Sequence, residues 1–187
     1  NNLPDAVVET EFTDDSPLVR SVNPAFTDVF GLDRPTVIDG DLNEYIVPPD
    51  DDARREADRL DEQGAEGEPV QAEIRRRTAD GFRDFLFRGV PYRHEDGRVW
   101  SFGIYTDITE QKERERRLEV LNRVLRHNLR NDLTVVLGLA DELHDRTDDA
   151  THRDLLERLQ AKAEQIASLS DRARDIERSV RRDDADT

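Results

Sequence analysis

The sequence of 187 residues contains neither cysteine nor methionine. Without cysteine the chain cannot form disulfides, thiolate metal sites or a cysteine nucleophile. It also has no apolar run of about 18 residues and no recognisable secretory signal, so we predict no membrane span and a cytoplasmic location. Because even an initiating methionine is missing, we expect a fragment or a processed chain.

Lysine is almost absent as well. Lys112 and Lys162 are the two lysines among 28 basic residues, against 44 acidic residues and a net charge of −16. Such a surface repels nucleic acid and anionic lipid, so neither is expected as a partner. It also repels itself at low ionic strength and is screened at high salt. The composition resembles that of proteins from salt-loving archaea, the alternative being an ordinary acidic protein.

Proline and glycine become rare beyond Asp107. All eight prolines and eight of the nine glycines precede it, as do all the aromatic residues. Because proline and glycine interrupt regular structure, the first part is predicted to be a mixed globular domain and the second part long helix. We therefore predict an α+β fold class, an antiparallel sheet with flanking helices followed by an all-α hairpin.

Short alternating apolar runs predict the strands of the first part, and turn residues such as Asp80-Gly81 and Asp96-Gly97 separate them. Asn23 is predicted to cap a helix over 24–30, and Asp50 begins one over 50–63. The predicted strands are 6–12, 18–22, 70–74, 85–87 and 100–104.

The second part begins with a capping signal. Asp107 is followed three residues later by Glu110, with Thr109 as a competing cap. Apolar residues then recur in steps of three and four over 118–143 and, after a polar connection, over 155–180. This pattern predicts an α-hairpin. Since one hairpin cannot bury its own apolar stripe, we expect a homodimer forming a four-helix bundle, the alternative being a hairpin folded back on the first domain.

The first 109 residues resemble a PAS domain. Four stretches in the order typical of that family carry the resemblance. They are Asn-Pro-Ala-Phe at 23–26 running to Phe-Gly-Leu at 30–32, Val-Pro-Pro-Asp-Asp at 47–51, Arg-Arg-Thr-Ala-Asp-Gly at 76–81, and Gly-Ile-Tyr-Thr-Asp-Ile-Thr-Glu at 103–110.

The second part resembles the dimerisation and histidine phosphotransfer domain of sensor histidine kinases. The resemblance lies in Leu-Arg-His-Asn-Leu-Arg-Asn-Asp-Leu-Thr at 125–134, followed by Gly138, where that family has H-E-L-R-T-P-L and then a glycine. The two resemblances imply a PAS-like sensor domain, a signalling helix, a phosphotransfer hairpin and a charged tail. The expected bounds are 1–109, 110–117, 118–182 and 183–187.

His127 suits a phosphoacceptor on helical geometry alone. It lies two residues from Leu125 and Leu129, so it points about 200° away from each, into solvent, with Asn131 on the same face. A neutral, exposed imidazole is nucleophilic, although an isolated histidine would be read as a plain surface residue. The resemblance implies that His127 is phosphorylated and passes the phosphoryl group to a response regulator aspartate. It also implies that Asn131 positions water in phosphatase action and that Arg130 lies beside the phosphate.

The sequence departs from that family twice. Asn128 stands where the family has an acidic residue, and an amide can accept a hydrogen bond from the ring but cannot act as a base. Asp132 replaces the family's proline, so no proline kink is imposed. As a hypothesis, the residues Asp107, Thr109 and Glu110 relay a change in the sheet into the helix that carries the histidine.

ATP, the phosphoryl donor, must be bound by another domain. The chain has no G-x-x-x-x-G-K-[ST] loop, and the family's ATP-binding domain would follow the hairpin. We expect that domain in cis in the full-length protein, and a fragment that is inactive alone. Two alternatives are a non-catalytic sensor scaffold and a phosphotransfer shuttle phosphorylated in trans.

The PAS ligand stays unknown. The lack of cysteine excludes the flavin–cysteine adduct of photosensing relatives, and the helix over 50–63 offers no histidine to haem. His144 and His152 flank the predicted turn, where we expect a solvated loop and no metal site. Eight large side chains either line a small-molecule pocket or form the core. They are Phe26, Phe30, Leu42, Tyr45, Phe85, Phe87, Trp100 and Phe102.

The charge pattern predicts a strong salt dependence of stability. We expect the melting temperature to rise steeply with KCl up to molar concentrations, because counterions screen the repulsion among the acidic side chains. Thermal unfolding followed by circular dichroism across a KCl series measures this. A flat or falling dependence would contradict adaptation to high salt.

Overall fold

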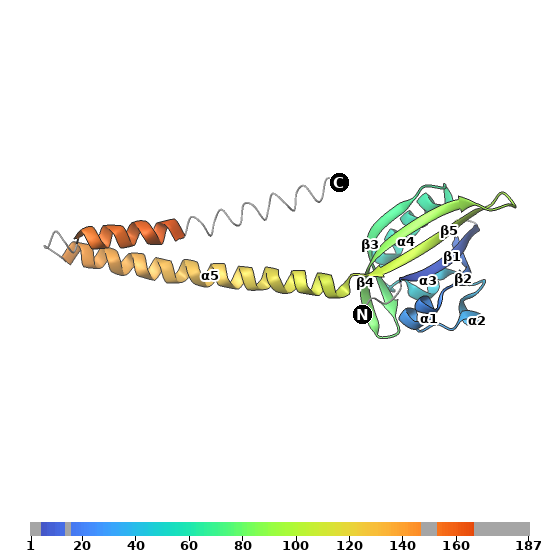
Figure 1. Cartoon of the computed structure of the whole chain (residues 1–187), viewed down its shortest axis with the longest axis horizontal. Coiled ribbons are helices and arrows are strands. Elements are labelled where there is room, and N and C mark those ends of the chain that lie inside the picture. Colours follow the sequence, from blue (N-terminus) through green and yellow to red (C-terminus); the bar gives the residue numbers. More distant parts are fainter. Residues whose placement is uncertain (1–4, 14–15, 147–152, 167–187) are drawn as a thin grey trace. The chain divides into compact units, whose positions relative to one another are not determined.

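The computed structural model describes residues 5–13, 16–146 and 153–166 (Figure 1). The chain divides into two compact units, Asn1–Arg114 and Glu115–Thr187. The first unit contains all the strands assigned within the described residues, and the second is helical.

The first unit is built on a five-stranded antiparallel sheet with the strand order β2-β1-β5-β4-β3. The N-terminal hairpin therefore lies beside the last strand, and β1 and β5 occupy inner positions of the sheet. The strands are β1 (Ala6–Thr13), β2 (Ser16–Val22), β3 (Val70–Thr78), β4 (Gly81–Arg93) and β5 (Val99–Asp107).

Four helices connect β2 to β3. They are α1 (Pro24–Phe30), α2 (Arg34–Val37), α3 (Leu42–Ile46) and α4 (Asp51–Ala65). The predicted sheet, α1 and α4 are confirmed, whereas α2 and α3 were not predicted. Those two helices have four and five residues, which is too short for an apolar period to be read.

Local chemistry explains where α1 begins and ends. The Asn23 side-chain oxygen accepts the N–H of Phe26 at 2.8 Å and that of Val7 in β1 at 3.0 Å, so one amide both caps the helix and ties it to the sheet. Gly31 ends the helix with φ of 66°, and a Cβ there would lie 2.7 Å from the Cβ of Ala79. Only glycine suits both demands.

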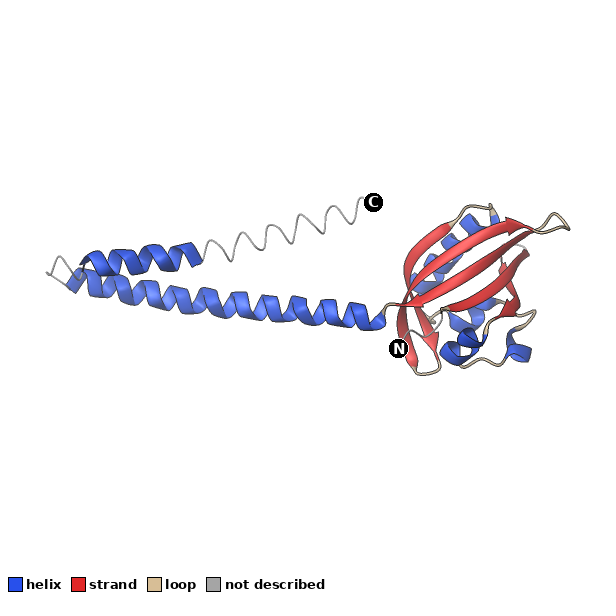
Figure 2. Ribbon diagram, in the orientation of Figure 1, coloured by secondary structure: helices blue, strands red, loops and turns tan. Residues whose placement is uncertain are grey.

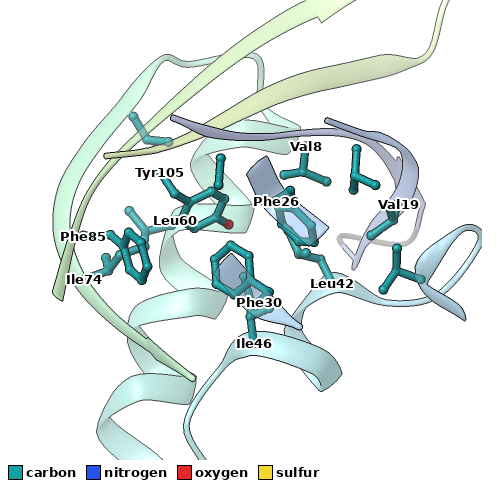
Figure 3. Packing of buried hydrophobic residues seen from close by; sticks show 14 residues of the cluster. Val8, Val19, Phe26, Phe30, Leu42, Ile46, Leu60, Ile74, Phe85 and Tyr105 are labelled. Carbon is teal, nitrogen blue, oxygen red and sulfur yellow. The ribbon is translucent and has the colours of Figure 1, made fainter. Parts of the chain in front are cut away.

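The core lies between the sheet and these helices. Phe30 of α1 packs against Phe26 and Tyr105, with ring centroids 4.5 and 5.4 Å apart, and Tyr105 in turn meets Phe85 edge-on at 5.9 Å. Figure 3 shows this aromatic cluster surrounded by aliphatic side chains. Sheet and helices therefore share one hydrophobic core, in which Phe26 and Phe85 are fully buried.

The face of strand β5 that packs on the core is not the face that carries Trp100 and Phe102. Trp100 and Phe102 were predicted to lie in the pocket or the core, but Phe102 is 40% exposed and neither belongs to the core cluster. Gly103 and Tyr105 face inward instead. A Cβ at Gly103 would lie 3.0 Å from Val8 of β1, so a small residue is needed on the inner face.

The helix α5 (Thr109–Arg146) begins in the first unit and continues through the second. Residues 153–166 form a second helix, which returns along α5 (Figure 2). Gln160 donates to Asp141 at 2.5 Å across this pair. The predicted α-hairpin is therefore confirmed for the described residues, and the apolar positions predicted beyond 166 lie outside them.

Candidate functional site

The junction between β5 and α5 is held by a set of hydrogen bonds to β4. Thr109 Oγ1 accepts the N–H of Asp84 at 3.0 Å and donates to the Asp84 carbonyl at 3.3 Å. The Ile108 N–H donates to the same carbonyl at 2.9 Å. We call these three bonds the β4–α5 latch. It fixes the first residues of α5 to a strand of the sheet.

Asp107 reinforces the latch through its side chain. One carboxylate oxygen accepts the N–H of Thr109 at 2.9 Å, and the other accepts from Arg83 of β4 at 3.0 Å. Burial alone would raise the pKa of Asp107, but the bonds from Thr109 and Arg83 outweigh it and hold the pKa below its ordinary value. The carboxylate is therefore charged near neutral pH.

Glu110 does not close the expected capping box with Asp107. Its carboxylate pairs with Arg114 at 2.7 Å, one helical turn ahead. Asp107 already bonds to Thr109, so the helix start is satisfied without a reciprocal bond. The acidic residue that ties this first turn of α5 to the sheet is Glu73 of β3, which forms an ion pair with Lys112.

Arg83 and Asp84 were missed as junction residues. The signal that could have found them is the register of the β4–β5 pair, in which Phe85 lies opposite Asp107. That register follows from the hairpin turn at 96–97, and it places the start of β4 beside the residues that follow β5.

The predicted phosphoacceptor face lies in the middle of α5. His127 and Asn131 are both exposed, and the Asn131 amide nitrogen lies 3.2 Å from Nε2 of His127. Because an amide nitrogen can only donate, Nε2 acts as the acceptor in this contact, with its lone pair directed at the Asn131 amide. The structure thus brings together two of the four predicted site residues.

The other two predicted residues lie to either side. Asn128 is exposed, and within the described part of the chain no hydrogen bond joins it to the His127 ring. Arg130 is also exposed, on a neighbouring face three residues along, and its carbonyl accepts from Thr134 at 2.9 Å.

The apolar stripe of the second unit is largely uncovered. Leu133, Ala140 and Ala163 are buried between the two helices, whereas Leu125 is 65% exposed. The other exposed apolar residues of α5 are Leu118, Val120, Leu121, Val124, Leu129, Val135, Val136, Leu139 and Leu143. So much uncovered apolar surface is typical of a face that another helix covers.

A small cavity of about 30 Å³ lies inside the first unit, between the sheet and α3 and α4. That volume holds one or two water molecules. Its wall combines apolar side chains with polar ones, among them Asn43, Asp61, Arg76 and Ser101. These polar groups were not predicted. An acidic residue beside Leu60, on the buried side of α4, is the signal that could have found Asp61.

The comparisons with known proteins agree with these two units. Residues 4–110 match the PAS domain family, and residues 117–181 match the His Kinase A (phospho-acceptor) domain family. The chain therefore belongs to the PAS-domain family and continues into a histidine kinase phosphoacceptor domain. This pair of domains supports a sensor kinase role in two-component signalling.

Solved structures resemble this chain over part of its length. An RNA-binding Light-Oxygen-Voltage receptor is 27% identical with a TM-score of 0.52, covering 66% of this chain and 34% of its own, so this chain spans about a third of that receptor. The PAS domain of the Cronobacter turicensis quorum-sensing receptor RpfR, in complex with BDSF, is 20% identical with a TM-score of 0.47, over 58% of this chain and 98% of its own. The comparison with curated proteins found no match. Across the described residues, no helix is both long and apolar enough to cross a membrane.

The latch predicts a pH-dependent effect of Asp107→Asn on stability. The pKa of Asp107 is lower in the folded chain than its ordinary value of 3.8, so its stabilisation is present above about pH 4 and is lost as the pH falls through the folded pKa. We expect the variant to lose about 1 kcal/mol at pH 7, because the group is partly exposed, and progressively less as the pH falls below the ordinary value of 3.8 and through the folded pKa. Urea unfolding at several pH values measures this.

Asp80→Asn is the matched control, because Asp80 pairs with the same Arg83 from a side chain that is far more exposed. We expect this control to change stability by less than about 0.5 kcal/mol across the same pH range. Equal losses in the two variants would show that Asp107 has no special part in the latch.

Proposed function

We propose that this chain is the sensor and phosphoacceptor part of a dimeric histidine kinase, with a PAS sensor over 1–109, a signalling helix over 110–117 and a phosphotransfer hairpin over 118–182. His127 accepts the γ-phosphoryl group of ATP, which a domain outside this sequence holds, and passes it to a receiver-domain aspartate. The supporting observation is the exposed His127 ring, with the Asn131 amide 3.2 Å from Nε2, inside a matched phosphoacceptor domain.

The transfer uses the lone pair on Nε2 of His127, which must first leave its hydrogen bond with the Asn131 amide. This nitrogen is the nucleophile. It attacks the γ-phosphorus, the bond from that phosphorus to the bridging oxygen breaks, and ADP leaves with the bonding electrons. The ring then loses its Nδ1 proton. Asn128 cannot take that proton as a carboxylate would, so water or a group outside this chain must. Autophosphorylation should therefore be slow. In the separate phosphatase reaction, Asn131 orients the water that hydrolyses the phosphorylated receiver aspartate.

A second copy of the chain supplies the cover that the apolar face of α5 needs. Fully burying a leucine or valine side chain contributes about 1.5–3 kcal/mol, and ten such residues of α5 are exposed. Two hairpins that pack these faces together form a four-helix bundle, and the acidic surface outside it suits work at high salt.

The β4–α5 latch carries the signal in this proposal. A change in the sheet shifts Asp84, and the bonds to Thr109 and Ile108 pass that shift to the first turn of α5. Asp107 holds the same turn through the N–H of Thr109, and Glu110 pairs with Arg114 one turn further along α5. Because the helix is continuous to His127, a rotation at its start changes which face of the histidine meets the ATP-binding domain.

Labelling with ATP tests the phosphoacceptor. The whole chain is incubated with γ-labelled ATP, with and without a separately produced histidine kinase ATP-binding domain. We expect acid-labile label on the chain in the presence of that domain, and its complete loss in His127→Gln, because the attacking nitrogen is gone. His144→Gln is the matched control on the same helix and should keep the label.

The other outcomes separate the alternatives. Label that appears only with an unrelated, complete histidine kinase identifies a shuttle phosphorylated in trans. An absence of acid-labile label in every arm identifies a non-catalytic scaffold and overturns the proposal. Label that survives in His127→Gln places the phosphoacceptor elsewhere.

The dimer makes a separate prediction. Analytical ultracentrifugation should give twice the chain mass of 21.6 kDa. Leu125→Arg should weaken association at least about tenfold, because it replaces an apolar contact by a charge. Arg123→Gln, on the opposite side of the same helix, should leave the association unchanged. A monomeric wild-type chain would contradict the four-helix bundle.

A further inference from the structure

Asp61 is a mostly buried carboxyl that the proposed phosphotransfer does not use. Helix α4 turns Ala57, Leu60 and Gly64 into the core and places Asp61 beside them, at the wall of the small cavity. Within the described part of the chain its carboxyl accepts one side-chain hydrogen bond, from Asn43 of α3 at 2.6 Å. One neutral amide is a poor environment for a buried negative charge.

The charged groups around Asp61 compete with one another. Asp41, before α3, and Asp58, one turn earlier on α4, both repel an ionised Asp61. From the sheet, Arg76 of β3 attracts an ionised Asp61. The hydroxyl of Tyr105 in β5 interacts electrostatically with both Arg76 and Asp61. Burial, the largest effect, raises the pKa of Asp61 to about 7, against the opposing bond from Asn43.

Arg76 has two possible acidic partners on α4. Arg76 is only 3% exposed and lines the same cavity. Its guanidinium donates to the Glu56 carboxylate at 3.1 Å and to the carbonyl of Arg75 at 2.9 Å. The Glu56 side chain is 31% exposed, so water can take over its solvation if Arg76 leaves. Asp61 lines the cavity beside Arg76 and accepts a bond from a neutral amide, so an ionised Asp61 gains more from the guanidinium.

We propose that Asp61 is a proton-binding site through which this PAS domain senses pH near neutrality, with Arg76 paired to Glu56 when Asp61 is protonated and drawn toward Asp61 when it is ionised. The ligand of the cavity is then the proton, together with the one or two waters that the space admits. Arg76 is the element with two arrangements, and the charge of Asp61 decides between them.

A route from this site to the latch passes through β5. Tyr105 lines the cavity with Asp61 and Arg76, packs into the aromatic cluster (Figure 3), and lies two residues before Asp107. A shift of Arg76 therefore repacks the strand that leads into α5. The effect on His127 rests on the proposed function, whereas protonation and the response of the latch do not.

Nuclear magnetic resonance of the whole chain tests both steps without ATP. The Asp61 carboxyl carbon is followed from pH 5 to pH 9, together with the backbone amides of Ile108 and Thr109. We expect Asp61 to titrate about 7 and the two amides to shift with the same midpoint. Asp61→Asn should abolish that shift, while Asp58→Asn, an exposed neighbour, should keep it with a lower midpoint because one repelling charge is gone.

Glu56→Gln provides the second variant. It frees Arg76 for Asp61, so the midpoint of Asp61 should fall by at least about half a pH unit, a free-energy change of about 0.7 kcal/mol. A midpoint below about pH 5 in the wild-type chain, or one unmoved in Glu56→Gln, overturns the proton site. Amide shifts that persist in Asp61→Asn overturn the route to the latch. Failure of ATP labelling alone would instead overturn the proposed phosphotransfer.

Discussion

The bonds between Thr109 and the backbone of Asp84 are the constraint on which the rest of the molecule depends. They join strand β4 of the PAS domain to a helix of 38 residues, and they do so with a side chain that satisfies both backbone groups of one sheet residue. A free helix end could rotate without regard to the sheet. Because this end is bonded to β4 and steadied by Arg83 and Asp107, the helix start must follow the sheet.

Local chemistry made parts of the fold predictable. Asn23 before Pro24, and the Asp-Gly pairs at two hairpin turns, determine their own geometry within a few residues. Strand β5 was harder, because its large apolar residues alternate with Ser101, Gly103 and Tyr105, and packing against β1 and the helices decides which face is inward. The close approach of Val8 to Gly103 is a tertiary fact that no single strand displays.

The candidate sites divide in the same way. The exposure of His127 and its contact with Asn131 follow from helical periodicity, which a sequence displays directly. Asp61 and Arg76 come from different elements and come together only in the folded core. No periodic pattern in the sequence therefore indicates that their opposite charges lie close together. For Glu110 the sequence predicted a contact that does not form. Its spacing from Asp107 matches a capping box, but its carboxylate pairs with Arg114 one turn away.

The confinement of every aromatic side chain to the residues before Asp107 also divides the chain optically. Near-ultraviolet absorbance and intrinsic fluorescence report the sensor unit, with the single indole at Trp100 stacked on the imidazole of His94. The α5 hairpin is silent to both and dominates the far-ultraviolet dichroism instead. Melting curves recorded by fluorescence and by far-ultraviolet dichroism therefore follow the two units of the chain separately. A difference between their midpoints measures how independently the two units unfold.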